Sequence, residues 1–272
     1  MIKYIFPFTY GFATRAQTAA NKLSFAAIFL LPILFICALS GMTADSFILR
    51  FALGMISLYS IYEIGYLQND VYTTKHEKNP TYRLDKCKRI EIERHAPLFI
   101  LVRIMIFLLC YALILIQSRE HTTEFLFAFI MLISIFMVHN LIRSRLNILT
   151  YLVLVSLKYA TLPVLFLPAE ALPVAFGSLF FAFALPRSIE HAAKPKYEVT
   201  LLRELHADTF RVVYYGILST FFVCLWLKEK QFMPPAILSL WFFAYRSILF
   251  CALHLKEDWM QQYREKRKEP IR

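Results

Sequence analysis

Residues 97–116 read PLFILVRIMIFLLCYALILI, and Arg103 is the only charged residue among them. An α-helix rises about 1.5 Å per residue, so a run of roughly 20 residues covers the ~30 Å hydrocarbon layer of a bilayer. A helix also satisfies nearly all of its backbone polar groups internally, which a lipid environment requires. The run therefore predicts a membrane-spanning helix.

Comparable apolar runs recur along the chain and, together with this one, predict eight membrane crossings. The predicted crossings are Leu23 to Ser40, Phe47 to Leu67, Pro97 to Ile116, Phe125 to Ile142, Ile148 to Leu167, Leu172 to His191, Val212 to Leu227 and Pro234 to Leu253. Of the 272 residues 58% are hydrophobic and 18% are charged, and the mean hydropathy is +0.53. A soluble domain of this size cannot bury so much apolar surface. We therefore predict an all-α, polytopic integral membrane bundle of eight to nine transmembrane helices.

We expect a single membrane domain over residues 1–272. Two long charged loops, 69–96 and 187–208, follow the second and the sixth predicted crossing. Two four-helix halves would place such loops four crossings apart, and internal duplication is common in membrane folds. The expected halves are about 15–143 and 144–254.

The distribution of charge predicts an orientation in the membrane. The chain has 30 Lys and Arg against 19 Asp and Glu, a net charge of +11. Most of the basic residues precede the first crossing or lie in the two charged loops and in a charged tail, 255–272. Because Lys and Arg beside crossings favour the cytoplasmic face, we expect a multi-pass protein with both termini and both loops in the cytoplasm. The charge favours a bilayer with anionic lipid as a partner, and we predict no nucleic-acid partner.

A polar stripe ends the second predicted crossing, at Tyr59, Glu63, Tyr66, Asn69 and Asp70. Their steps of four, three, three and one place them on or near one face of a helix. A carboxylate facing lipid would cost several kcal/mol, so we expect Glu63 to face the bundle interior or to be neutralised. Such a polar stripe implies a polar cavity in the bundle. The alternative is that Glu63 and the tyrosines are structural hydrogen-bonding partners.

Residues 69–83, which follow that stripe, read NDVYTTKHEKNPTYR. This stretch resembles the first motif of the UbiA prenyltransferase superfamily, NDxxDxxxD followed by a basic segment with Pro and Arg. Asn69, Asp70 and Glu77 match the first Asn, the first Asp and the last Asp, the last by a conservative change. Thr73 stands in place of the middle Asp.

Three further stretches are similar to segments of that family. Residues 185–191 read LPRSIEH and resemble its second acidic motif, with Glu190 as the carboxylate and Ser188 where Asp is usual. Lys158 lies in a stretch similar to the family's basic fifth-helix segment, and Arg15 stands where the family has an Arg before its first helix. The resemblance covers about three quarters of the chain, although family members usually have nine crossings.

The resemblance implies a UbiA-like bundle and a Mg²⁺-dependent enzyme that transfers an isoprenyl group from a prenyl diphosphate to an acceptor. The catalytic carboxylates would be Asp70, Glu77 and Glu190, and the Mg²⁺ ligands would be Asn69, Asp70, Glu77 and Glu190. The phosphate-binding residues would be Asn69, Lys78, Arg83, Lys158, Arg187, Lys194 and Arg15. These residue types suit the task, because Mg²⁺ is commonly held by one or two carboxylates plus substrate phosphates, and guanidinium groups match phosphate oxygens.

The changes at Thr73 and Ser188 leave other functions open. One is a transferase that moves a phosphoribosyl or another sugar phosphate onto a polyprenyl phosphate, and another is a UbiA-type terpene cyclase. A third is a lipid-binding or transport protein with a decayed site. For either transferase hypothesis, the expected ligand is a prenyl diphosphate or a polyprenyl phosphate lipid.

Overall fold

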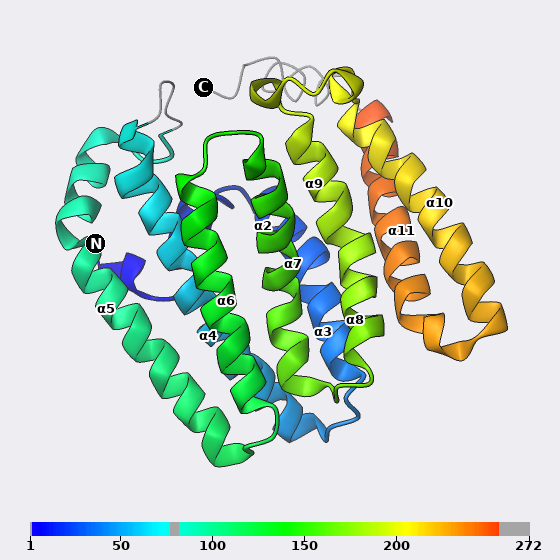
Figure 1. The fold of residues 1–272 in the computed structure, drawn as a ribbon, viewed down its shortest axis with the longest axis horizontal. Helices are drawn as coiled ribbons and strands as arrows, with labels where there is room; N and C mark the ends of the chain where they lie inside the picture. The colour runs from blue at the N-terminus through cyan, green and yellow to red at the C-terminus, as the bar shows by residue number, and fades with distance from the viewer. Residues whose placement is uncertain (1, 77–81, 256–272) are drawn as a thin grey trace. The chain divides into compact units, whose positions relative to one another are not determined.

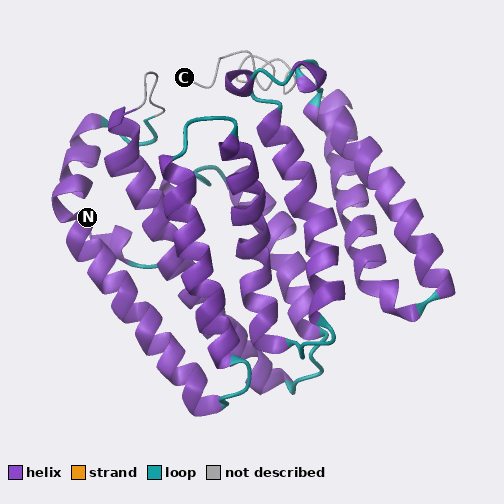
Figure 2. Ribbon diagram, viewed as in Figure 1, coloured by secondary structure: helices purple, strands orange, loops and turns teal. Residues whose placement is uncertain are grey.

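A computed structural model describes residues 2–76 and 82–255 of the chain. These residues are almost entirely helical, and no β-strand occurs among them (Figures 1 and 2). Eight of the described helices are long and apolar enough to cross a membrane. They are Ala19–Ala38, Ala44–Lys75, Lys86–Gln117, Thr122–Leu141, Leu146–Phe166, Leu172–Ala192, Ala207–Lys228 and Lys230–Ala252. Each contains most of one predicted run, so the all-α, multi-pass bundle is confirmed for the described residues.

The chain divides into two compact units, Met1–Pro173 (unit 1) and Val174–Arg272 (unit 2). The first five crossings lie in unit 1, and nearly all of the sixth lies in unit 2 with the last two. This division falls later in the chain than the boundary near residue 143 that the sequence suggested between two halves. The predicted charged tail lies outside the described residues, apart from its first residue.

Unit 1 is built around one central helix. Its helices are α1 (Thr9–Thr14), α2 (Ala19–Phe25), α3 (Leu31–Ala38), α4 (Ala44–Leu67), α5 (Lys86–Gln117), α6 (Thr122–Leu141) and α7 (Leu146–Phe166). Helix α4 packs against α1, α3, α5, α6 and α7 (Figure 1). It belongs to the most buried of the eight crossings, with 72% of its apolar stretch buried. The polar stripe on α4 therefore faces protein.

Unit 2 contains a helix pair and most of the sixth crossing. Its helices are α8 (Leu172–Leu179), which begins in unit 1, α9 (Leu185–Ala192), α10 (Ala207–Lys228) and α11 (Met233–Leu255). A π-helical turn over Phe180–Ala184 joins α8 to α9. Helices α10 and α11 pack along each other, and the hydroxyl of Tyr215 on α10 donates to the carbonyl of Ala182 at 2.7 Å. That bond ties α10 to the sixth crossing inside the unit.

Helix α5 begins well before the apolar run that predicted it. The side chain of Asp85 accepts a hydrogen bond from the backbone N–H of Lys88 at 2.9 Å and so caps the first turn. The first turns of α5 are polar, and the apolar run starts only at Pro97. The cap, which is not part of the apolar pattern, sets where the helix starts.

A buried ion pair links α4, α5 and the N-terminal segment. Nη1 of Arg103 on α5 lies 2.7 Å from Oε2 of Glu63 on α4, and both side chains are fully buried. The backbone N–H of Gly11 donates to the other oxygen of Glu63, and Nη2 of Arg103 donates to the carbonyl of Tyr4 at 2.9 Å. Glu63 thus faces the interior and is neutralised, as the sequence predicted.

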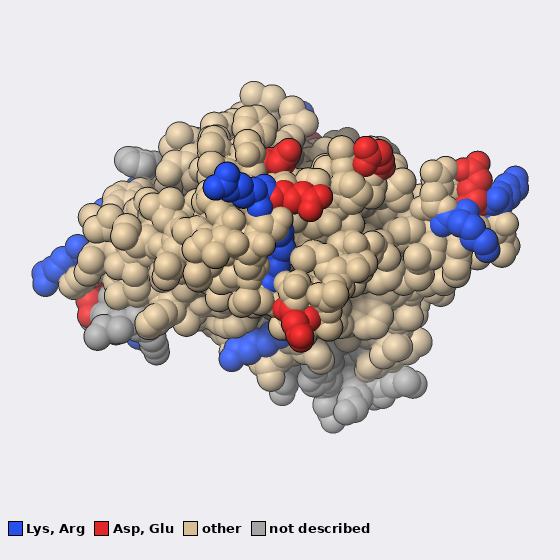
Figure 3. Space-filling model, turned by 90° about the horizontal axis from the view of Figure 1, so that it is seen from below, with Lys and Arg blue, Asp and Glu red and all other residues tan. Residues whose placement is uncertain are grey.

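Large apolar side chains remain exposed along the crossings. Ile116 is 81% exposed, Phe127 63% and Ile217 68%. Many large apolar side chains so exposed are unusual on a surface in water but suit a surface in contact with lipid. Figure 3 shows one face on which Lys, Arg, Asp and Glu are scattered among many other residues. Helices alone carry no sidedness, so the cytoplasmic placement of the termini and loops stays a prediction.

Candidate phosphate site

Asp70 lies where α4 gives way to a wider turn. Residues Gln68–Tyr72 form a π-helical turn directly after α4, and such turns occur frequently at functional sites. Asp70 is only 8% exposed. Its backbone carbonyl accepts a hydrogen bond from the hydroxyl of Thr74 at 3.0 Å, which continues the helical path beyond the carboxylate. The turn holds this carboxylate inward at the polar end of the crossing.

Arg15 binds both oxygens of Asp70. Nη1 of Arg15 lies 2.5 Å from Oδ2 and Nη2 lies 2.8 Å from Oδ1, the forked geometry that carboxylates and phosphates share. The guanidinium also lies over the ring of Tyr66, 3.9 Å from its centroid. The hydroxyl of Tyr10 donates to Oδ2 of Asp70 at 2.9 Å. Two predicted site residues are thereby brought together across 55 positions of sequence.

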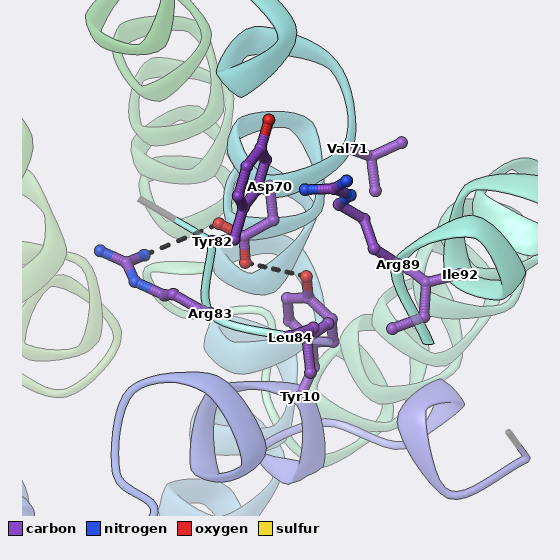
Figure 4. A pocket seen from close by; sticks show the side chains of 8 residues that line it. All are labelled: Tyr10, Asp70, Val71, Tyr82, Arg83, Leu84, Arg89 and Ile92. Atoms are coloured by element: carbon purple, nitrogen blue, oxygen red, sulfur yellow. Dashed lines mark hydrogen bonds and ion pairs between the residues drawn. The ribbon is translucent and has the colours of Figure 1, made fainter. Parts of the chain in front are cut away.

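Arg83 and Asn69 complete this Asp70 cluster. Nη1 of Arg83 lies 3.7 Å from Oδ1 of Asp70, and Nδ2 of Asn69 donates to the same oxygen at 3.1 Å. A cavity of about 10 Å³, room for about one water molecule, opens beside them. Figure 4 shows Arg83 and Tyr10 each joined to Asp70 within the cavity wall. The other lining residues are Val71, Tyr82, Leu84, Arg89 and Ile92.

The cluster carries an excess of positive charge. Burial opposes the charge on Arg15, but the Asp70 carboxylate outweighs this effect, and the pKa of Arg15 is raised. Burial and the neighbouring Arg15 lower the pKa of Arg83, partly offset by Asp70; an arginine so placed still remains protonated at neutral pH. Burial and the nearby carboxylate raise the pKa of Tyr10, so its hydroxyl stays a donor. Two guanidinium groups therefore face one carboxylate.

Lys158, on α7, lies among aromatic rings of unit 1. Its Nζ is 4.3 Å from the ring centroids of Phe29 and Tyr62 and 5.4 Å from that of Tyr59. Such placement stabilises a cation through the ring faces. The rings of Tyr62 and Tyr66 are 5.1 Å apart, and Arg15 lies on Tyr66. An aromatic column therefore connects Lys158 to the Asp70 cluster.

Unit 2 holds a second carboxylate bound by arginines, the Glu190 cluster. Nε of Arg211 on α10 lies 2.5 Å from Oε1 of Glu190, and its Nη2 lies 2.8 Å from Oε2. Nη1 of Arg187 lies 2.7 Å from the same Oε2. Arg211 also contacts Asp208 at 3.0 Å. The predicted residues Arg187 and Glu190 thus form an ion pair with each other, one turn apart on α9.

The remaining predicted residues lie near these clusters or outside the described residues. Nζ of Lys194 lies 3.1 Å from Nδ1 of His191, whose Nε2 lies 2.7 Å from the hydroxyl of Tyr197. Glu77 and Lys78 fall outside the described residues. The Asp70 cluster belongs to unit 1 and the Glu190 cluster to unit 2, so a shared site for both stays a prediction.

Sequence reasoning missed two residues that bind the predicted carboxylates. Tyr10 lies in the aromatic N-terminal segment, where nothing in the sequence separates it from neighbouring tyrosines and phenylalanines. Arg211 lies just beyond the charged loop 187–208 and belongs to none of the stretches that resemble the family's motifs. Its position three residues after Asp208, at the start of a crossing, is a signal that could have marked it as part of a polar cluster.

The described residues do not by themselves fit a magnesium site. Within this part of the chain, no three His, Cys, Asp or Glu side chains lie close enough together to hold a metal. Both oxygens of Asp70 and both of Glu190 are bound by guanidinium groups. A Mg²⁺ ion would have to compete with those groups, and a fuller ligand set depends on Glu77. The magnesium ion stays a prediction.

The Asp70 cluster, with the aromatic column leading to Lys158, is thus the candidate site for a phosphorylated ligand in unit 1. Comparisons with protein-family models, with curated proteins and with solved structures give no match for this chain.

Proposed function

We propose that this chain is a membrane-embedded transferase that acts on a phosphorylated isoprenoid lipid and moves its prenyl group from a prenyl diphosphate to an acceptor. The observation that carries the proposal is the Asp70 cluster, in which Arg15 and Arg83 face one carboxylate at the polar end of a membrane crossing. Lys158 supports it as a further cation of unit 1, since its Nζ lies 4.3 Å from the ring centroid of Tyr62 and that ring is 5.1 Å from the ring of Tyr66 on which Arg15 lies.

The proposed reaction breaks the bond between the prenyl carbon and the diphosphate oxygen. The electron pair leaves with the diphosphate, and the acceptor forms a new bond to that carbon and loses a proton. The guanidinium groups of Arg15 and Arg83 would stabilise the charge that develops on the departing diphosphate.

Arg15→Ala tests the transferase directly. Purified protein in lipid nanodiscs receives labelled farnesyl diphosphate and a membrane lipid extract as the source of acceptors, and released pyrophosphate and labelled lipid are measured. We expect turnover with the native chain and a loss of ~10- to 100-fold in Arg15→Ala, because a charge-assisted hydrogen bond contributes ~1.5–3 kcal/mol.

Lys22→Ala is the matched control, since Lys22 is an exposed cation close to Arg15 in sequence. It should retain full turnover.

The substrates that give product distinguish the alternative reactions. Product formation only when polyprenyl phosphate and phosphoribosyl diphosphate are supplied would indicate sugar-phosphate transfer in place of prenyl transfer. A cyclic hydrocarbon formed without any acceptor would indicate a terpene cyclase. Turnover of none of these substrates would overturn an enzymatic function.

A further inference from the structure

Of the three acidic residues that the family resemblance assigns to metal, the two in the described part of the chain are each bound by arginine. Asp70 accepts from Nη1 and Nη2 of Arg15, and Glu190 accepts from Nε and Nη2 of Arg211. Each pair is formed inside its own unit. A carboxylate bound by two nitrogens of one guanidinium group therefore occurs in the described part of each unit.

At the two positions where the family has Asp, the hydroxyls of Thr73 and Ser188 bond to backbone carbonyls. The hydroxyl of Thr73 donates to the backbone carbonyl of Asn69 at 3.1 Å, and that of Ser188 donates to the carbonyl of Ala184 at 2.7 Å. Both are bonds to the preceding turn of the same helix, which Ser and Thr commonly make. In these bonds both hydroxyls donate to backbone carbonyls and not to the carboxylate of their own cluster.

A carboxylate in a guanidinium fork occupies the positions that two phosphate oxygens would take. We propose that Arg15 and Arg83 form a phosphate site that binds a phosphoryl group directly, without Mg²⁺, and that the Asp70 carboxylate is the internal occupant that the phosphate displaces from Arg15. This inference rests on the proposed function for the identity of the lipid, but the binding chemistry is tested separately from transfer.

The exposure of the groups favours such an exchange. The side chain of Arg83 is 37% exposed and that of Arg15 is 18% exposed, whereas that of Asp70 is 9% exposed. Arg83 is 3.7 Å from Asp70, beyond hydrogen-bonding distance, so the carboxylate holds it by charge alone. Arg83 is therefore the more accessible of the two guanidinium groups to an arriving phosphate.

Asp70 keeps other partners when Arg15 turns to a phosphate. The hydroxyl of Tyr10 and the side-chain amide of Asn69 both donate to it, at 2.9 and 3.1 Å. A buried carboxylate with two donors left is far less costly than an orphaned one. The carboxylate is still an anion next to the incoming phosphate, so it weakens binding while it keeps Arg15 in place in the unliganded protein.

The sign of one substitution separates this site from a metal-bridged one. In EDTA, Asp70→Asn should tighten the binding of inorganic pyrophosphate ~10-fold, equivalent to about 1.4 kcal/mol, because it removes the competing and repelling charge. A carboxylate that holds Mg²⁺ would give the opposite result. The measurement is isothermal titration of pyrophosphate into purified protein in nanodiscs, in EDTA and in Mg²⁺.

Arg83→Gln provides a second test that leaves the Arg15 to Asp70 pair intact. It should weaken pyrophosphate binding ~10-fold in EDTA without changing the unfolding temperature, and Lys22→Gln should change neither. Binding that requires Mg²⁺ and weakens in Asp70→Asn would overturn the proposal, as would no binding in either buffer. Binding in EDTA without prenyl transfer would support the metal-free phosphate site and contradict the proposed transferase. Prenyl transfer with pyrophosphate binding that requires Mg²⁺ would support the transferase and contradict the metal-free site.

Discussion

Arg103→Met is expected to lower the free energy of unfolding by about 3–5 kcal/mol, because it leaves the Glu63 carboxylate buried without its counter-charge. Both side chains are fully buried in unit 1, 2.7 Å apart. Arg103 also donates to the carbonyls of Tyr4 and Phe6, at 2.9 and 3.3 Å. Its loss therefore also releases the N-terminal segment that carries Tyr10.

Unfolding of the protein in detergent micelles, followed by intrinsic fluorescence against denaturant, measures this effect. Arg94→Met is the matched control, since Arg94 is an exposed arginine on the same helix, and it should change stability by no more than ~0.5 kcal/mol. The double variant Glu63→Gln with Arg103→Met should recover part of the loss, because neither charge then remains buried. A stable Arg103→Met single variant would contradict the buried ion pair.

Gly65→Ala is expected to cost about 3 kcal/mol, the upper part of the usual range for overpacking a core. A Cβ atom at Gly65 would lie 2.3 Å from Cδ1 of Phe136, whose ring on α6 is itself buried. The side-chain amide of Asn140 donates to the carbonyl of Gly65 at 2.8 Å, so α4 cannot shift away from α6 without losing that bond. The close approach of these two helices requires glycine.

Gly177→Ala is the control for this substitution. Gly177 is also helical, and nothing lies within 4 Å of an added Cβ atom there, so the change should be neutral or slightly stabilising. Thermal unfolding of both variants under the same conditions gives the comparison. Equal stability of Gly65→Ala and Gly177→Ala would mean that α4 and α6 are not packed as described.

Most of the fold could be predicted because lipid imposes a simple rule on sequence. Runs of apolar residues such as 97–116 mark crossings by length alone, and all eight appear in the described residues. The π-helical turns at Ala26–Leu30 and Gln68–Tyr72 could not be predicted, since they carry no apolar or capping signature. The resemblance placed Asp70 and Arg15 in one site, but neither spacing nor composition joins residues so far apart.

The partners of the buried charges depend on tertiary packing. The cost of exposing a carboxylate to lipid predicted that Glu63 faces the interior. Its partner Arg103 is 40 residues away on another helix, within an apolar run whose pattern marks no ion pair. Tyr10 and Arg211 were missed for the same reason, because a donor is identified by where its helix packs. A single ligand shared by the Asp70 and Glu190 clusters stays a prediction, because the two clusters belong to different units.

The most direct test of a phosphate site at Arg15 and Arg83 is an experimental structure of the protein in nanodiscs with farnesyl thiodiphosphate, whose carbon–sulfur bond resists cleavage. We predict that the diphosphate lies within hydrogen-bonding distance of both guanidinium groups and that Arg15 has released the Asp70 carboxylate. A diphosphate bound away from both arginines, with the Arg15 to Asp70 pair undisturbed, would contradict this prediction.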